Sequence, residues 1–503
     1  MAGSSVSSAS AEPPIVLAVD IGSSSVRATL FDRLGQAVEG TQAAEAYAFE
    51  AGEPGAAEAD AEALLGRILR CVDGALAQAG AWADRIQGVG ISTFVTNILG
   101  VGEDDRPVTP IYTYADTRAE AEAPSLRADL DERAVHDRTG CRFHTSYLPA
   151  RFRWLARTQP EHLKRAKRWM SIGDYLFLRL FGRTCVSYSV ASWSGLLDRR
   201  RLIWDEPLLS FLPIDVSQLS PLTEIDQPLS GLRAEFAGRW PSLRTVPWFP
   251  AIGDGATANV GAGCTSPRQM ALTVGTSAAL RILTSEPVER LPWALWCYRL
   301  DRRRQLFGGA LTEGGSVFSW AKAVLNFHDT PSLEAALAAV EPDAHGLTVL
   351  PFFSGERSPG WAGDVRAVID GLSLRTAPIE ILRACLEAVA LRLAMVYDDL
   401  AAIAPQVEQI VANGGAILRS PAWMQIIADA LGRPVVPSAS TEASSRGAAL
   451  VALESLGARP EGESDACLTG TVYQPDPTRH RIYRAAMERQ HELYRRLIIT
   501  TQK

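Results

Sequence analysis

The sequence predicts an α/β protein with two related domains, and three observations support this prediction. Residues 15–31 (IVLAVDIGSSSVRATLF) have the pattern of a strand, a turn of glycine and serines, and a second strand. Residues 269–283 (QMALTVGTSAALRIL) repeat the plan with a Gly-Thr-Ser turn. Strands alternate with helical segments in both halves of the chain, as in α/β domains. Two similar hairpins about half a chain apart indicate a duplicated domain.

Each element of this plan has a local pattern behind it. In the first hairpin, Val26, Ala28 and Leu30 alternate with more polar residues, as expected for the second strand. Strands that run into glycine recur in corresponding places, at 87–93 (QGVGIST) and 409–415 (QIVANGG). The correspondence supports two domains with the same order of elements.

Two helices of the second half are predicted with their ends. From Pro378, apolar residues recur on one stripe to Leu400, which predicts a long core helix. In the segment 420–432, Ser420 suits a helix cap, Pro421 a first turn and Gly432 a stop. The whole pattern predicts a flexible leader at 1–14, domains at 15–262 and 263–478, and a helical tail at 479–503.

Composition excludes several classes of protein. Of 503 residues, 47% are apolar and 21% charged, and the formal charge of −7 gives no field that would attract nucleic acid. No stretch approaches the apolar length of a membrane-spanning helix. The start of the chain lacks a secretory signal, and the seven cysteines form no CxxC pair. We therefore expect a cytoplasmic protein with reduced thiols and no structural zinc, whose partners are small molecules or other proteins.

The first hairpin turn has the residues of a phosphate site. Asp20 ends a buried strand, and Gly22, Ser23 and Ser24 follow with backbone N–H groups and hydroxyls that suit phosphate oxygens. The carboxylate would hold Mg²⁺ directly or through water. The alternative is an ordinary hairpin in which Asp20 makes a turn hydrogen bond.

The second turn favours the phosphate interpretation. Gly275, Thr276 and Ser277 would face the first turn from the opposite domain. Two such turns would hold a triphosphate from both sides, which predicts a nucleotide in the cleft between the domains.

Asp254 is the candidate catalytic base. It lies between two glycines in the segment 250–263, which permit tight bends and close approach of a substrate. A carboxylate there would take the proton of a hydroxyl as that oxygen attacks the γ-phosphorus. The alternative is a surface turn.

Gly414 and Gly415 are the candidate adenine site. Without a Cβ, they would let an adenine ring lie against the backbone, although a tight turn alone would also use two glycines.

Taken in order, these segments resemble the FGGY family of carbohydrate kinases from about residue 15 to about 455. The motifs that carry the resemblance are VDIGSSSVRATLFD, PIYTYADTRA, SIGDYLFLRLFG, GDGATANVGAG, TVGTSAAL, ALTEGGSVFSW, PFFSGERSPGW, RACLEAVALR and NGGAILRSPAWMQIIADALG. The resemblance implies two ribonuclease H-like, actin-like domains that close around a sugar, with ATP and Mg²⁺ in the cleft.

The resemblance also implies a role for each matching residue. Asp254 matches the catalytic base and Asp20 the residue that organises Mg²⁺. The nucleotide positions are Gly22, Ser23, Ser24, Gly275, Thr276, Gly315, Ser319, Gly414, Gly415 and Ala416. The sugar positions, in addition to Asp254, are Phe94, Thr96, Asn97, Asp116 and Arg118.

Within the family the motifs look most like gluconate kinases, with xylulose kinases next. Gluconate kinases usually carry Trp-His after Ser-Thr-Phe, where this chain has Val95 and Thr96, so an imidazole that faces the sugar is missing. Tyr114 replaces the usual tryptophan before Ala-Asp. These changes are expected to alter selectivity.

The resulting prediction is an ATP-dependent kinase for a terminal primary hydroxyl, with D-gluconate as the leading acceptor and D-xylulose or another ketose or polyol as the alternative. Two other classes stay open: a nucleotide-driven switch like actin or the heat-shock ATPases, and a sugar-binding regulator without turnover. For the oligomeric state, a homodimer is one alternative.

Several further residues are predicted to be structural. Asp174 is expected at a helix start. Trp193 is expected in the packing, although its segment could approach the substrate. Glu356 and Arg357 are expected to pair with each other, and the DRRR runs at 198–201 and 301–304 to be solvated turns.

Overall fold

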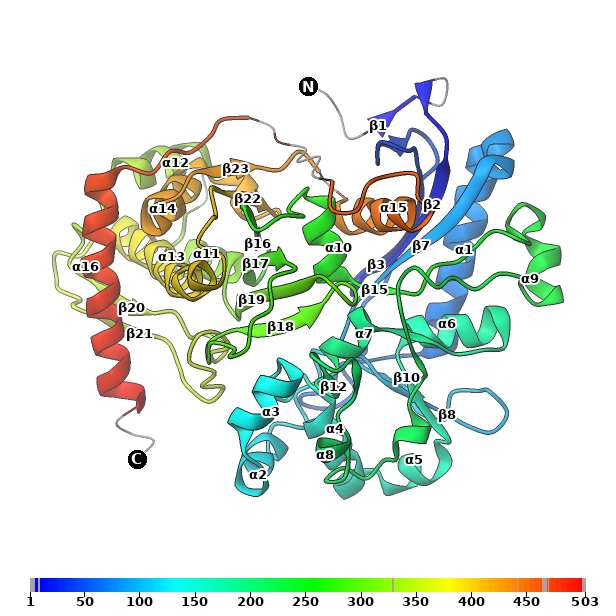
Figure 1. The fold of residues 1–503 in the computed structure, drawn as a ribbon. Helices are drawn as coiled ribbons and strands as arrows, with labels where there is room; N and C mark the ends of the chain where they lie inside the picture. The colour runs from blue at the N-terminus through cyan, green and yellow to red at the C-terminus, as the bar shows by residue number, and fades with distance from the viewer. Residues whose placement is uncertain are drawn as a thin grey trace.

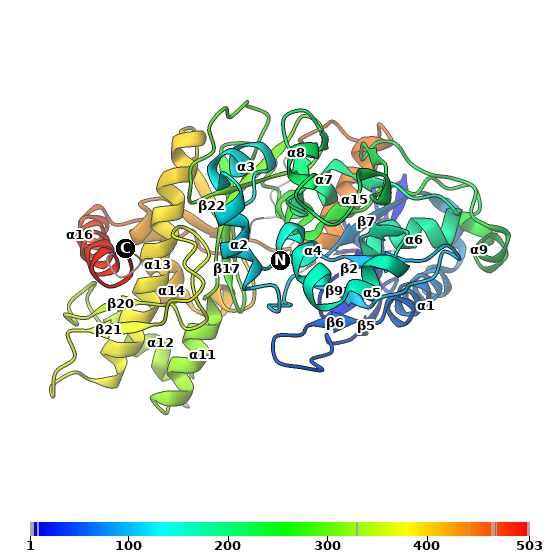
Figure 2. The ribbon, with the colours of Figure 1, turned by 90° about the horizontal axis from the view of Figure 1, so that it is seen from below.

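The computed structural model describes residues 5–7, 10–327, 330–440, 442–463, 468 and 470–499. Two domains, each built around a mixed sheet, lie side by side (Figures 1 and 2). The strands of the first sheet are, in spatial order, β1 (Ser5–Val6), β4 (Ala37–Val38), β3 (Ser25–Phe31), β2 (Ile15–Ile21), β7 (Ile86–Thr93) and β15 (Ile252–Gly253), and β5 (Ala43–Ala46) also pairs with β3.

The second sheet repeats the central pattern of the first. Its strands are, in spatial order, β18 (Trp296–Arg299), β19 (Gln305–Leu311), β17 (Ala278–Thr284), β16 (Gln269–Val274), β22 (Gln409–Asn413) and β23 (Val435–Pro437). In each sheet an antiparallel hairpin, β2–β3 or β16–β17, is followed by two parallel strands, β7 and β15 or β22 and β23. The predicted duplication and both predicted hairpins are confirmed.

Sixteen α-helices are described. Those of the first half are α1 (Ala61–Ala79), α2 (Glu122–Asp129), α3 (Glu132–Thr139), α4 (Leu148–Thr158), α5 (Pro160–Arg165), α6 (Ile172–Phe181), α7 (Tyr188–Trp193), α8 (Glu206–Leu209), α9 (Ala234–Arg239) and α10 (Asp254–Gly261). Those of the second half are α11 (Gly315–Val324), α12 (Thr330–Ala339), α13 (Pro378–Ile403), α14 (Pro421–Leu431), α15 (Ala443–Ser455) and α16 (Pro477–Tyr494). The smaller strands are β6 (Glu58–Ala59), β8 (Leu99–Val101), β9 (Ile111–Tyr112), β10 (Arg168–Met170), β11 (Val186–Ser187), β12 (Leu197–Asp198), β13 (Ile203–Trp204), β14 (Leu222–Thr223), β20 (Thr348–Leu350) and β21 (Val368–Asp370).

The predicted helix ends are found where the capping residues stand. In α14, the Ser420 side chain accepts the Trp423 N–H, and Gly432 ends the helix with φ +64°. In α6, Ser171 and Asp174 form a reciprocal capping box, which confirms Asp174 as a helix-start residue. Pro378 opens α13, the predicted core helix. Its residues 382–394 are all buried, so the helix is enclosed in the second domain and buries more than the predicted stripe.

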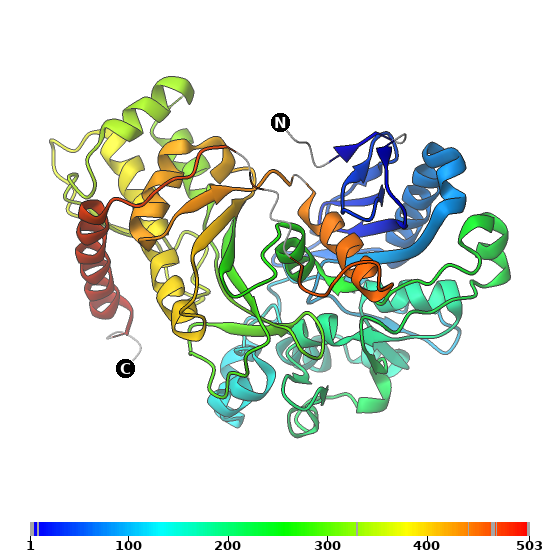
Figure 3. The ribbon, with the colours of Figure 1, turned by 45° about the horizontal axis from the view of Figure 1, so that its top comes forward.

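Helices α10 and α15 lie between the two sheets (Figures 1 and 3). A Cβ on Gly261 would lie 1.8 Å from the Ala443 carbonyl oxygen, and one on Gly447 would lie 1.8 Å from that of Thr257. Only glycine permits this crossing. Helix α15 also buries Leu450 and Val451 in one cluster with Val16 of β2, so the second half of the chain completes the core of the first domain.

At the two ends of the chain the structure shows contacts that the prediction did not include. In the predicted leader, β1 pairs in parallel with β4, because the sheet edge offers unpaired backbone groups there. The C-terminal helix α16 begins at Pro477 and belongs to the second domain: the buried Tyr483 hydroxyl lies 3.0 Å from Glu387 of α13. Residues 500–503 lie outside the described part.

The six described cysteines are free, and Cys467 lies outside the described residues. Among the helices of the described chain, none combines the length and the apolar character needed to cross a membrane.

Candidate active site

A cavity of about 280 Å³ lies between the domains, and residues of both domains line it. The residues used below are Thr96, His144, Asp254, Ser277, Arg281 and Arg357. A larger cavity, of about 460 Å³, lies elsewhere, between Glu224 and the turn 301–304. The charged residues that line this larger cavity largely pair with one another, as Arg302 does with Glu224 and Arg304 with Asp301. Because these charges already have partners, the smaller cavity is the candidate site.

Asp254 stands at the first residue of α10, directly after β15. Its Oδ1 accepts the Gly255 N–H at 2.7 Å. Burial raises its pKa to about 6, the neighbouring Asp20 also raises it, and Arg281 opposes them. A carboxylate with this pKa is mostly ionised at neutral pH and can accept a proton.

The glycines beside Asp254 make room for an indole ring. A Cβ on Gly253 would lie 2.7 Å from Trp193 Nε1, and one on Gly255 would lie 2.8 Å from Trp193 Cη2. Gly253 has φ −61°, which any residue adopts. The two glycines are therefore needed because Trp193 packs against the backbone on either side of Asp254. The tight bends that the sequence predicted here are not found.

Asp20 lies beside Asp254 because of the strand order. It is next to last in β2, and β2, β7 and β15 are parallel neighbours, so their carboxyl ends meet. Burial raises the pKa of Asp20 to about 6, against the opposing effects of Ser92 and then of Arg27, whose Nη1 lies 3.6 Å from Oδ2. Its Oδ1 is buried and has no hydrogen-bond partner.

These two acids fit a magnesium ion. Mg²⁺ takes carboxylate oxygens, usually one or two, together with water and phosphate. The unpartnered Oδ1 of Asp20 is an oxygen of this kind, and a cation there would offset the burial of both charges.

The predicted nucleotide residues of the second domain come together. The Gly315 N–H donates to the Gly275 oxygen at 2.7 Å, and the Ala416 N–H donates to the Val274 oxygen at 3.2 Å. A Cβ on Gly315 would lie 2.5 Å from that of Ala416. Gly414 has φ +100°, and a Cβ there would lie 2.5 Å from the Val274 oxygen. The three loops thus form one close-packed backbone surface.

The remaining nucleotide positions lie on turns and on a helix surface. The Gly22 N–H closes the first hairpin turn on the Ser25 oxygen at 3.0 Å, while Ser23 is partly buried and Ser24 exposed. The second turn closes in the same way, from Gly275 to Ser277, and leaves Thr276 and Ser277 exposed. Ser319 is exposed on α11.

Of the residues predicted to contact sugar in the loop 94–97, the structure places only Thr96 on the cavity. Phe94 is fully buried in the core of the first domain. The Asn97 amide is used by backbone, since it donates to the Phe94 oxygen at 2.5 Å and accepts the Ile172 N–H at 2.9 Å. Both predictions are corrected: these side chains hold the loop that presents Thr96.

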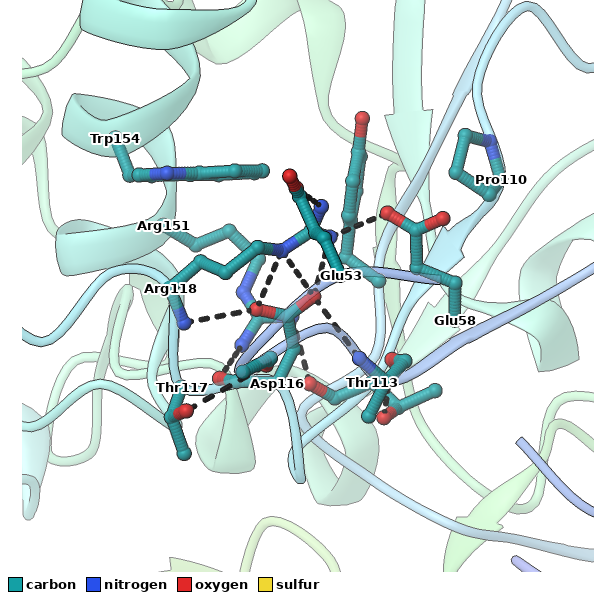
Figure 4. A network of polar contacts seen from close by, with 12 residues as sticks. Glu53, Glu58, Pro110, Thr113, Asp116, Thr117, Arg118, Arg151 and Trp154 are labelled. Carbon is teal, nitrogen blue, oxygen red and sulfur yellow. Dashed lines mark hydrogen bonds and ion pairs between the residues drawn. The ribbon is translucent and has the colours of Figure 1, made fainter. Parts of the chain in front are cut away.

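Asp116 and Arg118 also lie off the cavity, in a closed polar network (Figure 4). The Arg118 guanidinium binds Asp116, Glu53 and Glu58, and it lies 4.5 Å from the centre of the Trp154 ring. Because its donors are taken by three carboxylates, the predicted sugar contacts of Asp116 and Arg118 are corrected to a structural role.

Sequence reasoning missed the charged residues of the cavity. Arg281 comes from β17 and donates to Thr273 Oγ1 at 3.0 Å, while its Nε has no partner. Arg357 donates to the Leu311 oxygen at 2.9 Å. The predicted pairing with Glu356 is wrong, since Glu356 binds Arg392 and Tyr494. Among the described residues, no carboxylate lies within 4.0 Å of the nitrogens of Arg281 or Arg357.

Comparison with known proteins agrees with this architecture. Family models described as the FGGY family of carbohydrate kinases, N-terminal and C-terminal domain, match residues 15–261 and 270–456. The chain belongs to the FGGY family of carbohydrate kinases. It is an ATP-dependent sugar kinase that uses ATP and Mg²⁺. Members of its family act on small sugars. The alternative of a protein-binding nucleotide switch is set aside.

Relatives within the family differ in substrate. The gluconokinase of Bacillus subtilis (strain 168) is 28% identical over 92% of this chain and 91% of its own. The structure of a gluconate kinase from Lactobacillus acidophilus matches with TM-score 0.87 at 24% identity, over 96% of this chain and 98% of that chain. A xylulose kinase from Rhodospirillum rubrum matches with TM-score 0.89 at 25% identity, over 97% and 100%. Because these identities are low, they do not determine the acceptor. It has to be inferred from the residues of the site.

Proposed function

We propose that the protein transfers the γ-phosphoryl group of ATP to the terminal primary hydroxyl of D-gluconate. The observation that carries this choice is the charge of the cavity: in the part of the chain that the structure describes, no carboxylate lies within 4.0 Å of the Arg357 guanidinium, while Asp254 acts on Arg281 without forming an ion pair with it. A partly buried charge is normally paired, so an anionic acceptor is the natural partner of Arg357. The similarity to the gluconokinase of Bacillus subtilis supports the same choice.

Each polar group of the cleft has a role in this proposal. Asp254 accepts the proton of the acceptor hydroxyl, and Asp20 holds Mg²⁺ through the oxygen that lacks a partner. The turns at Gly22 and Gly275 donate backbone N–H groups to the phosphates. The bare backbone at Gly414 and Gly415 lies against the adenosine, with Gly315, Ser319 and Ala416 beside it.

When bound, ATP would supply the transferable phosphoryl group, and Mg²⁺ would neutralise part of its charge. The protein aligns the acceptor hydroxyl with this group and keeps water from competing as an acceptor, as the two domains close on the cleft. We also propose that the reaction takes place in the cytoplasm, where ATP is abundant.

The second candidate acceptor is D-xylulose or another ketose or polyol. Thr96 favours it, because this small side chain on the cavity replaces the larger donor expected in gluconate kinases. A sugar-binding regulator without turnover is the third candidate.

One coupled assay of ADP formation separates these candidates. The acceptors are D-gluconate, D-xylulose, D-ribulose, glycerol and fucose-type ketoses. The proposal expects the highest kcat/KM with D-gluconate and loss of that activity in Asp254→Asn. A preference for D-xylulose selects the second candidate, and sugar binding by calorimetry without ADP formation selects the third.

A further inference from the structure

The cavity has two chemically different ends. Arg281 stands opposite Gly308 in the pairing of β17 with β19, and it lowers the pKa of Asp254. Arg357 donates to the oxygen of Leu311, which pairs with Ala278, three residues and about 10 Å farther along β17. The Trp361 N–H donates to the Arg357 oxygen at 2.6 Å, and the centre of the His144 ring lies 5.8 Å from that of Trp361, so His144 lies on the Arg357 side. An acceptor that spans the cavity therefore meets a base at one end and a cation at the other.

His144 is neutral, and its tautomer follows from its contacts. Burial lowers its pKa to about 3, and the positive charge of Arg357 acts in the same direction. The Ser146 backbone N–H donates to Nδ1 at 3.2 Å, so Nδ1 is an acceptor and the proton resides on Nε2. The ring packs edge-on against Tyr147 and Trp361, with ring centres 6.5 and 5.8 Å apart. His144 lines the cavity, and among the hydrogen bonds of the described residues none uses its Nε2–H.

Glu313, the acid that acts on the pKa of Arg357, does not neutralise it fully. Burial raises the pKa of Glu313 itself to about 7, so part of it is protonated at neutral pH. The Glu313 Oε1 is already used by the Ser354 N–H, at 2.6 Å. The guanidinium keeps donors beyond the one it gives to Leu311.

We infer that Arg357 and His144 form a carboxylate subsite, which binds the acid group of an aldonate while its primary hydroxyl meets Asp254. This inference rests on the proposed function and specifies which residues select the acid. A guanidinium matches a carboxylate with paired N–H donors, and the imidazole N–H adds a neutral donor. A site built for that charge rejects an analogue without it. The imidazole that the loop 94–97 lacks is thus supplied by residue 144.

A matched pair of acceptors tests the inference. D-Glucitol is D-gluconate with the carboxylate reduced to a primary alcohol, and D-gluconamide keeps the planar group without the charge. Wild-type kcat/KM is expected to be at least tenfold higher for D-gluconate than for either. Arg357→Gln is expected to lower kcat/KM for D-gluconate roughly 10- to 100-fold, mainly through KM, and to change that for D-glucitol little.

A pair of variants at His144 tests the role of the imidazole. His144→Phe keeps a ring but removes the donor, and is expected to raise KM for D-gluconate several-fold. His144→Gln places an amide N–H near the position of Nε2 and is expected to restore most of the loss. Arg366→Gln, which removes an exposed arginine of the same domain, is the matched control and is expected to behave as wild type. Thermal unfolding of each variant checks that the fold is kept.

Calorimetry with D-gluconate alone separates failure of the subsite from failure of the kinase proposal. Equal use of D-gluconate and D-glucitol by the wild type, or equal losses on both in Arg357→Gln, would overturn the subsite and leave the kinase intact. Binding of D-gluconate that depends on Arg357, without phosphorylation of any acceptor, would support the subsite and overturn the proposed function.

Discussion

Replacement of Asp254 by asparagine is expected to inactivate the protein and to stabilise it at the same time. The two side chains have nearly the same shape, so Oδ1 can still accept the Gly255 N–H. Asparagine cannot take the hydroxyl proton, and loss of a general base typically lowers kcat by a factor of roughly 10² to 10⁴.

The stability gain follows from the raised pKa of Asp254. A rise from 3.8 to about 6 means that the ionised form is destabilised in the fold by on the order of 3 kcal/mol. Because the folded state binds the proton more tightly than the unfolded state, this penalty is full above pH 6 and shrinks as the pH falls toward 4. Asp254→Asn should therefore melt several degrees above wild type at pH 8, and the difference should shrink at lower pH.

The assay is gluconate-dependent ADP formation together with thermal unfolding at pH 8 and pH 5. Asp84→Asn, which removes an exposed carboxylate, is the control for the change in net charge, and should alter neither quantity. Full activity in Asp254→Asn would refute its role as the base. A lower melting temperature at pH 8 would refute the claim that its charge is buried at a cost.

Three further predictions concern the same cleft. The value of kcat/KM for the acceptor should fall as the pH drops through about 6, because the coupled acids Asp20 and Asp254 then become protonated; a flat profile from pH 8 to pH 5 would contradict this. Asp20→Asn should raise the Mg²⁺ concentration for half-maximal rate by roughly 10- to 100-fold, measured by Mg²⁺ titration at fixed ATP, and an unchanged titration would remove Asp20 from the metal site. Gly414→Ala should raise KM for ATP and lower the melting temperature, since φ +100° and the Val274 oxygen at 2.5 Å oppose a Cβ, whereas Gly52→Ala, with open space around it, should do neither.

The fold was largely predictable from local patterns in the sequence. Period-two alternation at Val26, Ala28 and Leu30 predicts a strand, and the structure buries all three side chains. Ser420 and Gly432 mark the ends of α14 as capping chemistry requires. These signals depend on residues a few positions apart, and the sequence displays such spacings directly.

The acids and glycine turns were predicted by motif, whereas the walls of the cavity were not. His144, Arg281 and Arg357 meet across three distant segments of the chain, and the spacing of residues does not reveal such a meeting. Phe94 illustrates the converse error, because an aromatic residue beside a substrate loop looks the same in sequence whether it faces the cavity or the core.

The DRRR runs show the same limit. A run of charges is usually solvated, yet Arg199 is 1% exposed and donates to Gln305 and to the Val288 oxygen across the domain interface. Arg304 is buried between Asp301 and Glu454. Partners far away in the sequence decide whether such a charge is buried.

A crystal structure with D-gluconate and a non-hydrolysable ATP analogue tests the central claim most directly. We expect the primary hydroxyl within hydrogen-bond distance of Asp254, the carboxylate on Arg357 and His144, and the triphosphate between the turns at Gly22 and Gly275. A sugar bound outside this cleft, or one whose primary hydroxyl points away from Asp254, would contradict the account.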